Sequence, residues 1–355
     1  MEKANSPHAN KILWWILGVA LFLLATVSGV LIGISWDGGQ GKGWIALVDQ
    51  VSMFSTIFLG IFIEAVPYLF LGTLASGLVE VFVDQDSLLK IIPRSKLGSA
   101  LAGASLGLFF PVCECGVVPL ARRLFRKGLP APVGISFLLA APVLNPIVIA
   151  STFAAFGNTP VFWGRLAMTF LISILVGGVF AFQTDHSQVL LPSSSMAYQP
   201  VAPLQRNVIG QRTAPGVGVA QRLQKVAVIA ANEFFEMGRY LVLGALLAAF
   251  MQTLIPQGWL LAVGQGPILS VLVMIALAVI LSVCSTVDAF IALAFAGSFN
   301  AGSLLAFLVY GPMVDIKSTL MFLRVFRRRT VLYLVTLPLM LILLAAVAMN
   351  YFVRF

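Results

Sequence analysis

Long, nearly uncharged apolar runs dominate this sequence and decide what it can fold into. A helix that crosses a bilayer core of about 30 Å needs roughly 20 apolar residues. Apolar runs of this order fall at 12–35, 52–79, 130–156, 160–182, 226–255, 302–323 and 330–353. Only 10% of the 355 residues are charged and 60% are hydrophobic, too few charges to cover the surface of a soluble protein. The sequence therefore predicts an all-α polytopic membrane protein.

Two further apolar regions, 97–125 and 267–299, are interrupted by polar residues and cysteine. We expect each of them to enter the membrane and return on the same side as a hairpin. Residues 183–222 are rich in Gln, Ser, Pro and Arg without apolar periodicity, which predicts a flexible cytoplasmic linker. The expected units are an additional N-terminal helix with its outer loop, a first membrane repeat, the linker and a second membrane repeat, at 1–50, 51–182, 183–222 and 223–355.

The placement of Lys and Arg predicts the orientation in a plasma (inner) membrane. With the N-terminus inside and both interrupted regions folded as hairpins, 17 of the 22 Lys and Arg residues lie in the cytoplasm, against Lys42 and Arg354 outside. A single crossing by 97–125 would instead place the basic stretch 122–127 outside. The expected topology is therefore seven full crossings and two hairpins, with the C-terminus outside.

The two halves of the chain resemble each other, which predicts an internal repeat. Residues 64–72 match 236–244 in a Glu, a Tyr and a Gly, and Cys113 then matches Cys284. A third ordered match sets Phe137, Pro142 and Asn145 against Phe307, Pro312 and Asp315. Basic loops of one half correspond to uncharged loops of the other, so equivalent loops lie on opposite sides of the membrane. Such an inverted-topology repeat is expected to bring broken helices together near the midplane.

Each hairpin region contains a junction of helix-breaking and polar residues, at 110–116 and 282–288. Backbone groups freed at membrane depth are tolerated only where protein or a water-filled cavity satisfies them. We therefore expect the two junctions to face each other across a central cavity; a pair of packing kinks with inert cysteines is the alternative. The substrate-binding candidates are Cys113, Glu114, Cys115, Cys284, Asn145 and Asp315.

Acidic residues inside the apolar segments are a second group of candidates, because a charge there costs at least about 2.5–3.5 kcal/mol. Glu64 and Glu236 are repeat mates, and a desolvated carboxyl group can take up and release a proton near neutrality. A structural hydrogen bond is the alternative for these two, and a local ion pair between Glu236 and Arg239 is expected. Glu233 is expected near the interface in a structural role. The ion-coupling candidates are Glu64, Glu236, Asp288 and Lys317.

The matched segments around Asn145 and Asp315 predict broken helices. Pro146 restricts Asn145 to extended backbone angles. Carbonyl groups freed beside Asn145 or Asp315 would form a hydrogen-bonding wall for a substrate, and Lys317 would neutralise Asp315 or hold an anion. A proline kink and an internal ion pair without further function are the alternatives.

The residues Pro111-Val-Cys-Glu-Cys-Gly-Val-Val-Pro119, a following Gly128 and the segment 137–146 resemble the YraQ-like predicted permeases, a family that includes the organoarsenical efflux permease ArsP. The resemblance covers about residues 50–350. It implies a plasma-membrane permease that in some members expels trivalent methylated or aromatic arsenicals. The family usually has a small polar residue where this chain has Glu114. Trivalent arsenic is soft and selects thiolate ligands, which would suit the three cysteines.

The leading functional hypothesis is a secondary transporter or facilitator of a small solute, without an ATP site, because the sequence has no phosphate-binding loop. We expect the chain not to be an enzyme. Import of a sulfur oxyanion or thiol compound competes with arsenical efflux. A membrane thiol redox enzyme using Cys113 and Cys115, or an assembly subunit, are alternatives from other classes. We expect no resident cofactor or metal and no nucleic-acid partner. A small-molecule substrate and the lipid bilayer are the expected partners, and a homo-oligomer is left open.

Overall fold

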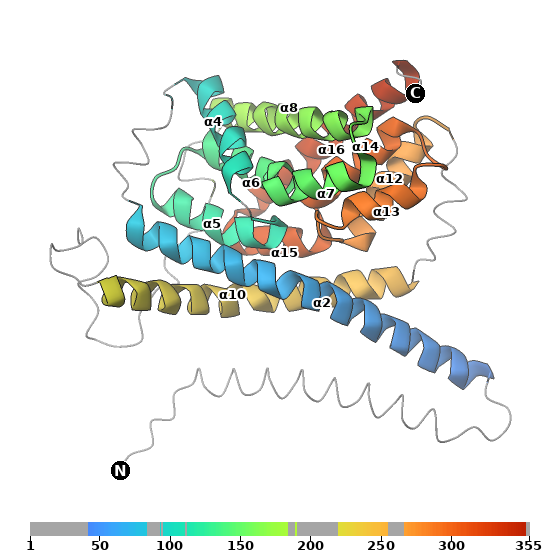
Figure 1. The fold of residues 1–355 in the computed structure, drawn as a ribbon, viewed down its shortest axis with the longest axis horizontal. Helices are drawn as coiled ribbons and strands as arrows, with labels where there is room; N and C mark the ends of the chain where they lie inside the picture. Colours follow the sequence, from blue (N-terminus) through green and yellow to red (C-terminus); the bar gives the residue numbers. More distant parts are fainter. Residues whose placement is uncertain are drawn as a thin grey trace, which may run out of the picture.

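The computed structural model describes residues 42–83, 93, 95–110, 112–183, 189, 219–254 and 266–352. The predicted helix at 12–35 and most of the predicted linker lie outside these residues. The described chain forms twelve helices (Figure 1): α2 (Lys42–Phe82), α4 (Lys96–Phe109), α5 (Glu114–Arg126), α6 (Ala131–Leu144), α7 (Pro146–Phe156), α8 (Pro160–Gln183), α10 (Val219–Leu254), α12 (Leu269–Leu281), α13 (Asp288–Phe295), α14 (Ala301–Met313), α15 (Ile316–Val325) and α16 (Arg328–Phe352).

The helices repeat one order of elements in each half of the chain. A long helix (α2 or α10) is followed by a hairpin of two short helices (α4 and α5, or α12 and α13). A helix broken near its middle (α6 and α7, or α14 and α15) and a last long helix (α8 or α16) complete each half. The internal repeat predicted from the sequence is thus a repeat of structure, and each interrupted region is a pair of short helices.

In space, the two halves are arranged so that a contact between two helices has an equivalent contact when the halves are exchanged. The long helices α2 and α10 lie side by side along one edge of the molecule (Figure 1). Helix α5 of the first half contacts α15 of the second, and α13 of the second half contacts α7 of the first. Exchanging the halves turns one of these pairs into the other, as an inverted repeat requires.

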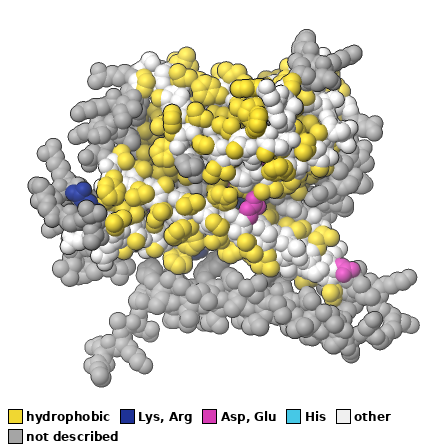
Figure 2. Space-filling view, viewed as in Figure 1, with side chains coloured by type: hydrophobic (Ala, Val, Ile, Leu, Met, Phe, Trp, Pro, Cys, Tyr) yellow, Lys and Arg dark blue, Asp and Glu magenta, His cyan; other side chains and the backbone are white. Residues whose placement is uncertain are grey.

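Six of the described helical segments are long and apolar enough to cross a membrane, at Val48–Phe82, Ala131–Phe156, Pro160–Phe182, Gln221–Thr253, Ala301–Val325 and Arg328–Tyr351. They correspond to six of the seven predicted crossings. The face shown in Figure 2 is broadly apolar, with few charged groups among the described residues. Large side chains such as Phe109 and Phe182, both 75% exposed, stand on this surface, which suits contact with lipid. The chain is a multi-pass membrane protein.

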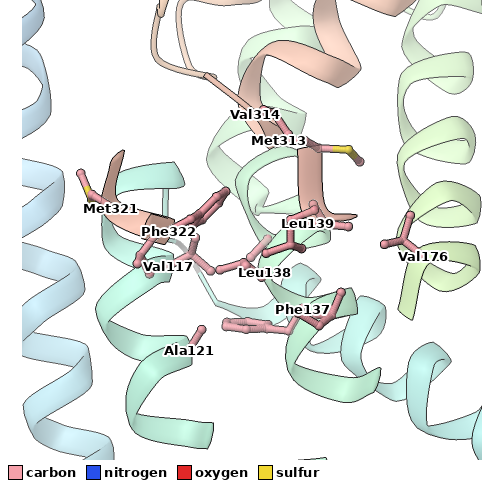
Figure 3. Close-up of a cluster of buried hydrophobic side chains, with 14 of the residues drawn as sticks. Val117, Ala121, Phe137, Leu138, Leu139, Val176, Met313, Val314, Met321 and Phe322 are labelled. Atoms are coloured by element: carbon pink, nitrogen blue, oxygen red, sulfur yellow. The ribbon is translucent and has the colours of Figure 1, made fainter. Parts of the chain in front are cut away.

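The hydrophobic core lies between the halves. Figure 3 shows side chains from α5, α6 and α8 against others from the segment 313–322 of the second half. Helix α4 approaches α6 closely at Gly103 and Gly107, where an added methyl group would meet the backbone of Val133 and Ala141. Small residues four positions apart allow such close contact of membrane helices. The first hairpin is therefore fixed against the broken helix that follows it.

Helix α10 begins at Val219, so the last four residues of the predicted linker belong to a helix. Val189 contacts the second half, where its carbonyl oxygen accepts a hydrogen bond from the Arg327 amide at 3.1 Å.

Candidate functional site

Each hairpin junction is held by the broken helix of its own half. In the first junction, α4 ends at Phe109 and α5 begins at Glu114; Pro111 lies outside the described residues. The Val112 carbonyl oxygen accepts a hydrogen bond from Asn145 Nδ2 at 3.3 Å. In the second junction, Ser282 has a left-handed backbone with φ 46°, and its hydroxyl accepts a hydrogen bond from the Ile316 amide at 3.3 Å. In the first half, the side chain at the break therefore satisfies a backbone group of the junction. In the second half, the side chain at the junction satisfies a backbone group at the break.

The two junctions meet in the interior of the protein. The Sγ atoms of Cys113 and Cys284 and a carboxylate oxygen of Glu114 all lie within 4.8 Å of one another. Ser285 Oγ contacts Glu114 Oε2 at 3.5 Å. These four residues are buried, with at most 4% exposure. Cys115 is also buried, in the first turn of α5, but it is not one of the three converging ligands.

A buried ammonium group lies between two buried carboxylates beside the cysteines. Lys317 Nζ is 3.6 Å from Glu114 Oε1 and 3.5 Å from Asp315 Oδ2, and each side chain is 2% exposed. Among the described residues, neither of these two oxygens has a hydrogen-bond donor. With all three groups charged, the cluster carries one excess negative charge in a low-dielectric interior, where charges act strongly on one another. Such a cluster favours a cation over an anion.

Asn145 and Asp315 cap the second parts of the broken helices. Asn145 Oδ1 accepts the Val148 amide at 2.9 Å, and Asp315 Oδ1 accepts the Ser318 amide at 2.6 Å. The Ser318 hydroxyl also contacts Asp315 Oδ1. Capping side chains satisfy backbone donors that have no partner inside the helix. Both residues thus have a local structural task, and Asp315 keeps its second oxygen directed to Lys317.

Asp288 forms a bidentate ion pair. Arg165 on α8 donates from its two terminal nitrogens to Asp288 Oδ1 at 3.0 Å and Oδ2 at 2.6 Å, and it also binds the Thr152 hydroxyl. Both charged side chains are buried. We did not identify Arg165 as a candidate from the sequence. Its position inside the apolar run 160–182 was the available signal, because a charge at that depth requires a partner.

The repeat mates Glu64 and Glu236 have different surroundings. Glu64 Oε1 is buried without a hydrogen-bond partner among the described residues, and the Glu64 carboxylate interacts electrostatically with Asp288 and Lys317. Glu236 instead pairs with Arg122 at 3.0 Å and with Arg324 at 3.6 Å. The expected pair between Glu236 and Arg239 is wrong, because the Arg239 guanidinium donates to the Phe235 carbonyl oxygen and longer-range partners reach Glu236 first.

Glu236 belongs to a group of ion pairs at the basic ends of α5 and α15, which we call the basic-end cluster. Arg123 Nε donates to Glu233 at 2.5 Å, and Arg123 also lies 3.7 Å from Glu80 on α2. Lys127 Nζ donates to three carbonyl oxygens at the end of α2. Glu233 therefore has a buried structural partner, as expected. The cluster is formed by Glu80, Arg122, Arg123, Lys127, Glu233, Glu236 and Arg324.

Repeated membrane halves, broken helices and a buried polar centre between them define a protein of the transporter class. A family described as a predicted permease, ArsP_1, matches residues 50–351, and the chain belongs to this family. The YraQ-like family expected from the sequence is thereby confirmed, and the protein is a membrane permease.

The relatives carry related names. The chain is 40% identical over 290 residues to the UPF0718 protein YcgR of Bacillus subtilis, covering 81% of this chain and 94% of YcgR. It is 36% identical over 290 residues to a putative two-component membrane permease complex subunit of Streptococcus mutans, covering 81% and 92%. UPF0718 protein YraQ of Escherichia coli is 24% identical over 195 residues, covering 49% and 52%. No solved structure matches the chain.

Proposed function

We propose that this permease moves a small thiophilic solute across the plasma membrane through the site between the two junctions. The convergence of one thiol from each half, Cys113 and Cys284, beside the Glu114 carboxylate carries the proposal. Soft centres select sulfur ligands, and trivalent organoarsenicals, moved outward, are the first class to test. Binding forms two arsenic–sulfur bonds and breaks two arsenic–oxygen bonds. Each thiol proton leaves with a hydroxyl group as water, so no oxidant is needed. Cys115, in the first turn of α5, is the third thiol, to which arsenic bound at Cys113 or Cys284 can transfer.

The packing of the half-helices supports transport by alternating access. Helices α5 and α15 pack against α2 and α10, whereas α7 and α13 pack against each other and against α6, α8 and α14. The structure thus has one end where the half-helices cover the long helices and another where they do not. By the positive-inside rule the covered, basic end faces the cytoplasm, with the N-terminus inside and the C-terminus outside.

Glu64 is the proton-coupling residue that we propose. Its unpartnered buried oxygen and its electrostatic link to Lys317 connect it to the site. Glu236 and Asp288 would act on coupling through their ion pairs, and Lys317 through the charge that it shares with Glu114. Glu64→Gln is expected to flatten the pH dependence of transport without reducing expression. The Glu64→Gln/Glu236→Gln double variant tests both mates, and an unchanged pH profile would contradict proton coupling.

The alternatives are weaker. An imported sulfur oxyanion would need a free buried cation, but Lys317 is already balanced by Glu114 and Asp315. A thiol redox enzyme would use Cys113 and Cys115 as its working pair, but Cys113 contacts Cys284 of the other half as well as Cys115, which favours a shared binding site for a solute. The names of the relatives also favour a permease over an enzyme.

The test is resistance to and accumulation of methylarsenite in a transport-deficient host that expresses the full chain. We expect resistance and lowered accumulation with the natural chain. Cys113→Ser and Cys284→Ser should abolish both, and Cys115→Ser should weaken them. No resistance from the well-expressed natural chain would contradict the organoarsenical substrate, and full resistance of the Cys113→Ser/Cys284→Ser variant would contradict thiol binding.

A further inference from the structure

The same junction site has the ligand set of a thiophilic metal-ion site. We propose that it binds a divalent cation of the Zn²⁺ and Cd²⁺ class as cargo, through Cys113, Cys284 and Glu114, with Lys317 as the counter-charge that keeps binding reversible. The inference rests on the proposed function, because it assigns a second substrate class to the same site.

The separation of the three donor atoms supports the proposal. They lie within 4.8 Å of one another. Zinc bonds of about 2.3 Å to sulfur and 2.0–2.2 Å to oxygen put tetrahedral ligands about 3.5–3.8 Å apart, so closure around an ion needs shifts of roughly 1 Å. Cys113 and Cys284 both lie in non-helical junction backbone, which can make such shifts without breaking a helix.

The chemistry of the donors determines which ions fit. Two thiol ligands and one carboxylate select Zn²⁺ and softer ions over Mg²⁺ and Ca²⁺, which require oxygen ligands. Three protein ligands leave the fourth tetrahedral position open, an arrangement that structural zinc sites avoid. An open position allows an incoming or outgoing ligand to exchange, as transport of the ion requires.

Charge balance also fits a dication. Cysteine binds metal as thiolate, so the two thiol ligands release two protons when one dication enters. The net charge of the buried cluster of thiols, carboxylates and ammonium is therefore the same with and without the ion. The interior exchanges one dication for two protons and avoids the cost of a new uncompensated buried charge.

Lys317 limits the strength of binding. Its ammonium lies 3.6 Å from Glu114 Oε1, on the ligand that the ion needs, and Asp315 at 3.5 Å offers it a second partner. An ion on Glu114 repels the ammonium toward Asp315, the cap of α15. The backbone of Lys317 lies directly against Gly244 of α10, so this helix–helix contact holds the base of the side chain while its ammonium moves between the two carboxylates.

The experiment is a titration of the purified full chain in lipid nanodiscs with Cd²⁺, followed by the ultraviolet absorption of cadmium–thiolate bonds, with Zn²⁺ as competitor. We expect one ion per chain. Cys113→Ser and Cys284→Ser should each lower affinity by more than the roughly 10–100-fold that loss of an outer-sphere partner costs. Gly60→Ala on α2, whose added methyl group meets nothing within 4 Å among the described residues, is the control and should bind like the natural chain. Lys317→Gln should bind at least about tenfold more tightly.

No cadmium–thiolate absorption from the natural chain would overturn the proposal, and so would equal binding by the Cys113→Ser/Cys284→Ser variant or an equal loss of binding in Gly60→Ala. The titration of the natural chain tests the proposal even if a variant fails to fold. Methylarsenite resistance without metal binding removes this inference and leaves the proposed function intact. Metal binding without transport of either solute supports the site and contradicts the proposed function.

Discussion

The repeat mates α5 and α13 have similar places in the two halves but very different surroundings. Helix α5 is buried along nearly its whole length, from Glu114 to Phe125, whereas α13 buries only Asp288, Ala289 and Ala292. The second parts of the broken helices differ in the same sense. Ile147 on α7 is 45% exposed, and its mate Lys317 on α15 is 2% exposed. The two halves therefore have the same order of helices, but equivalent helices are buried to different extents.

The difference shows which interactions select this arrangement. The basic-end cluster connects α5 and α15 to α2 and α10. The stretch 122–127 that supplies most of its cations corresponds to the uncharged 297–302 in the other half. The other end is connected instead by one fully buried pair, Arg165 with Asp288. Among the described contacts, one end thus relies on several pairs, some of them partly exposed, and the other on a single pair that is almost completely buried.

The largest effect is expected from breaking the deeply buried pair. Arg165→Leu leaves Asp288 without its partner in the interior, which costs about 3–5 kcal/mol of stability. Thermal unfolding in detergent measures the loss. Arg165→Leu/Asp288→Leu removes both charges and should recover most of it. Natural stability in the single variant would mean that the pair does not hold α13 in place.

The next effect is expected at the covered end. Arg123→Gln leaves the buried Glu233 unpaired at a cost of about 2–3 kcal/mol, which weakens the packing of α5 on α10. The corresponding population shift should raise maleimide labelling of the junction cysteines from the cytoplasmic side by roughly 30-fold. Arg239→Gln is the control, because that guanidinium bonds only within α10 in the described contacts. Equal labelling of both variants would contradict the idea that the basic-end cluster holds α5 against α10.

A smaller effect is expected from a methyl group between α2 and α5. Gly72→Ala would place its Cβ on the backbone of Gly116, and such overpacking costs about 1–3 kcal/mol. Gly60→Ala on the same helix meets nothing within 4 Å, so it should stabilise by roughly 0.5–1 kcal/mol through helix propensity. Unfolding in mixed micelles compares the two. Equal stabilities would show that α5 does not press on α2.

The smallest effect is expected for Arg122→Gln. Its partner Glu236 is 26% exposed and retains Arg324, so no buried carboxylate is left unpaired and the loss should stay below the roughly 2 kcal/mol expected for Arg123→Gln. The difference from the natural chain should shrink as salt screens the remaining charges. A loss as large as that of Arg123→Gln would contradict the ranking of the two pairs by burial.

The parts of the fold that sequence reasoning predicted depend on local pattern. Apolar runs, the interrupted hairpins and the break at Asn145 and Pro146 each follow from neighbouring residues. The pairs of Arg165 with Asp288 and Arg123 with Glu233 join residues more than a hundred positions apart, so local pattern did not reveal them. The asymmetry was also out of reach, because an inverted repeat is compatible with either end being covered. The roles of the junction residues stay proposals.

The close contact of Gly72 with Gly116 provides a point about which α5 could tilt against α2. The contact lies at the beginning of the helix, next to Glu114 and Cys115, and ten residues separate it from Arg126 at the far end. At a rise of about 1.5 Å per residue the arm is about 15 Å long, so a tilt of about 10° moves its tip by about 3 Å. A tilt of this size would separate the basic side chains of the basic-end cluster from their carboxylate partners. The thiols lie close to the Gly72–Gly116 contact, so they would barely move. Under the proposed function, the ion pairs at the covered end would separate before the binding thiols move apart.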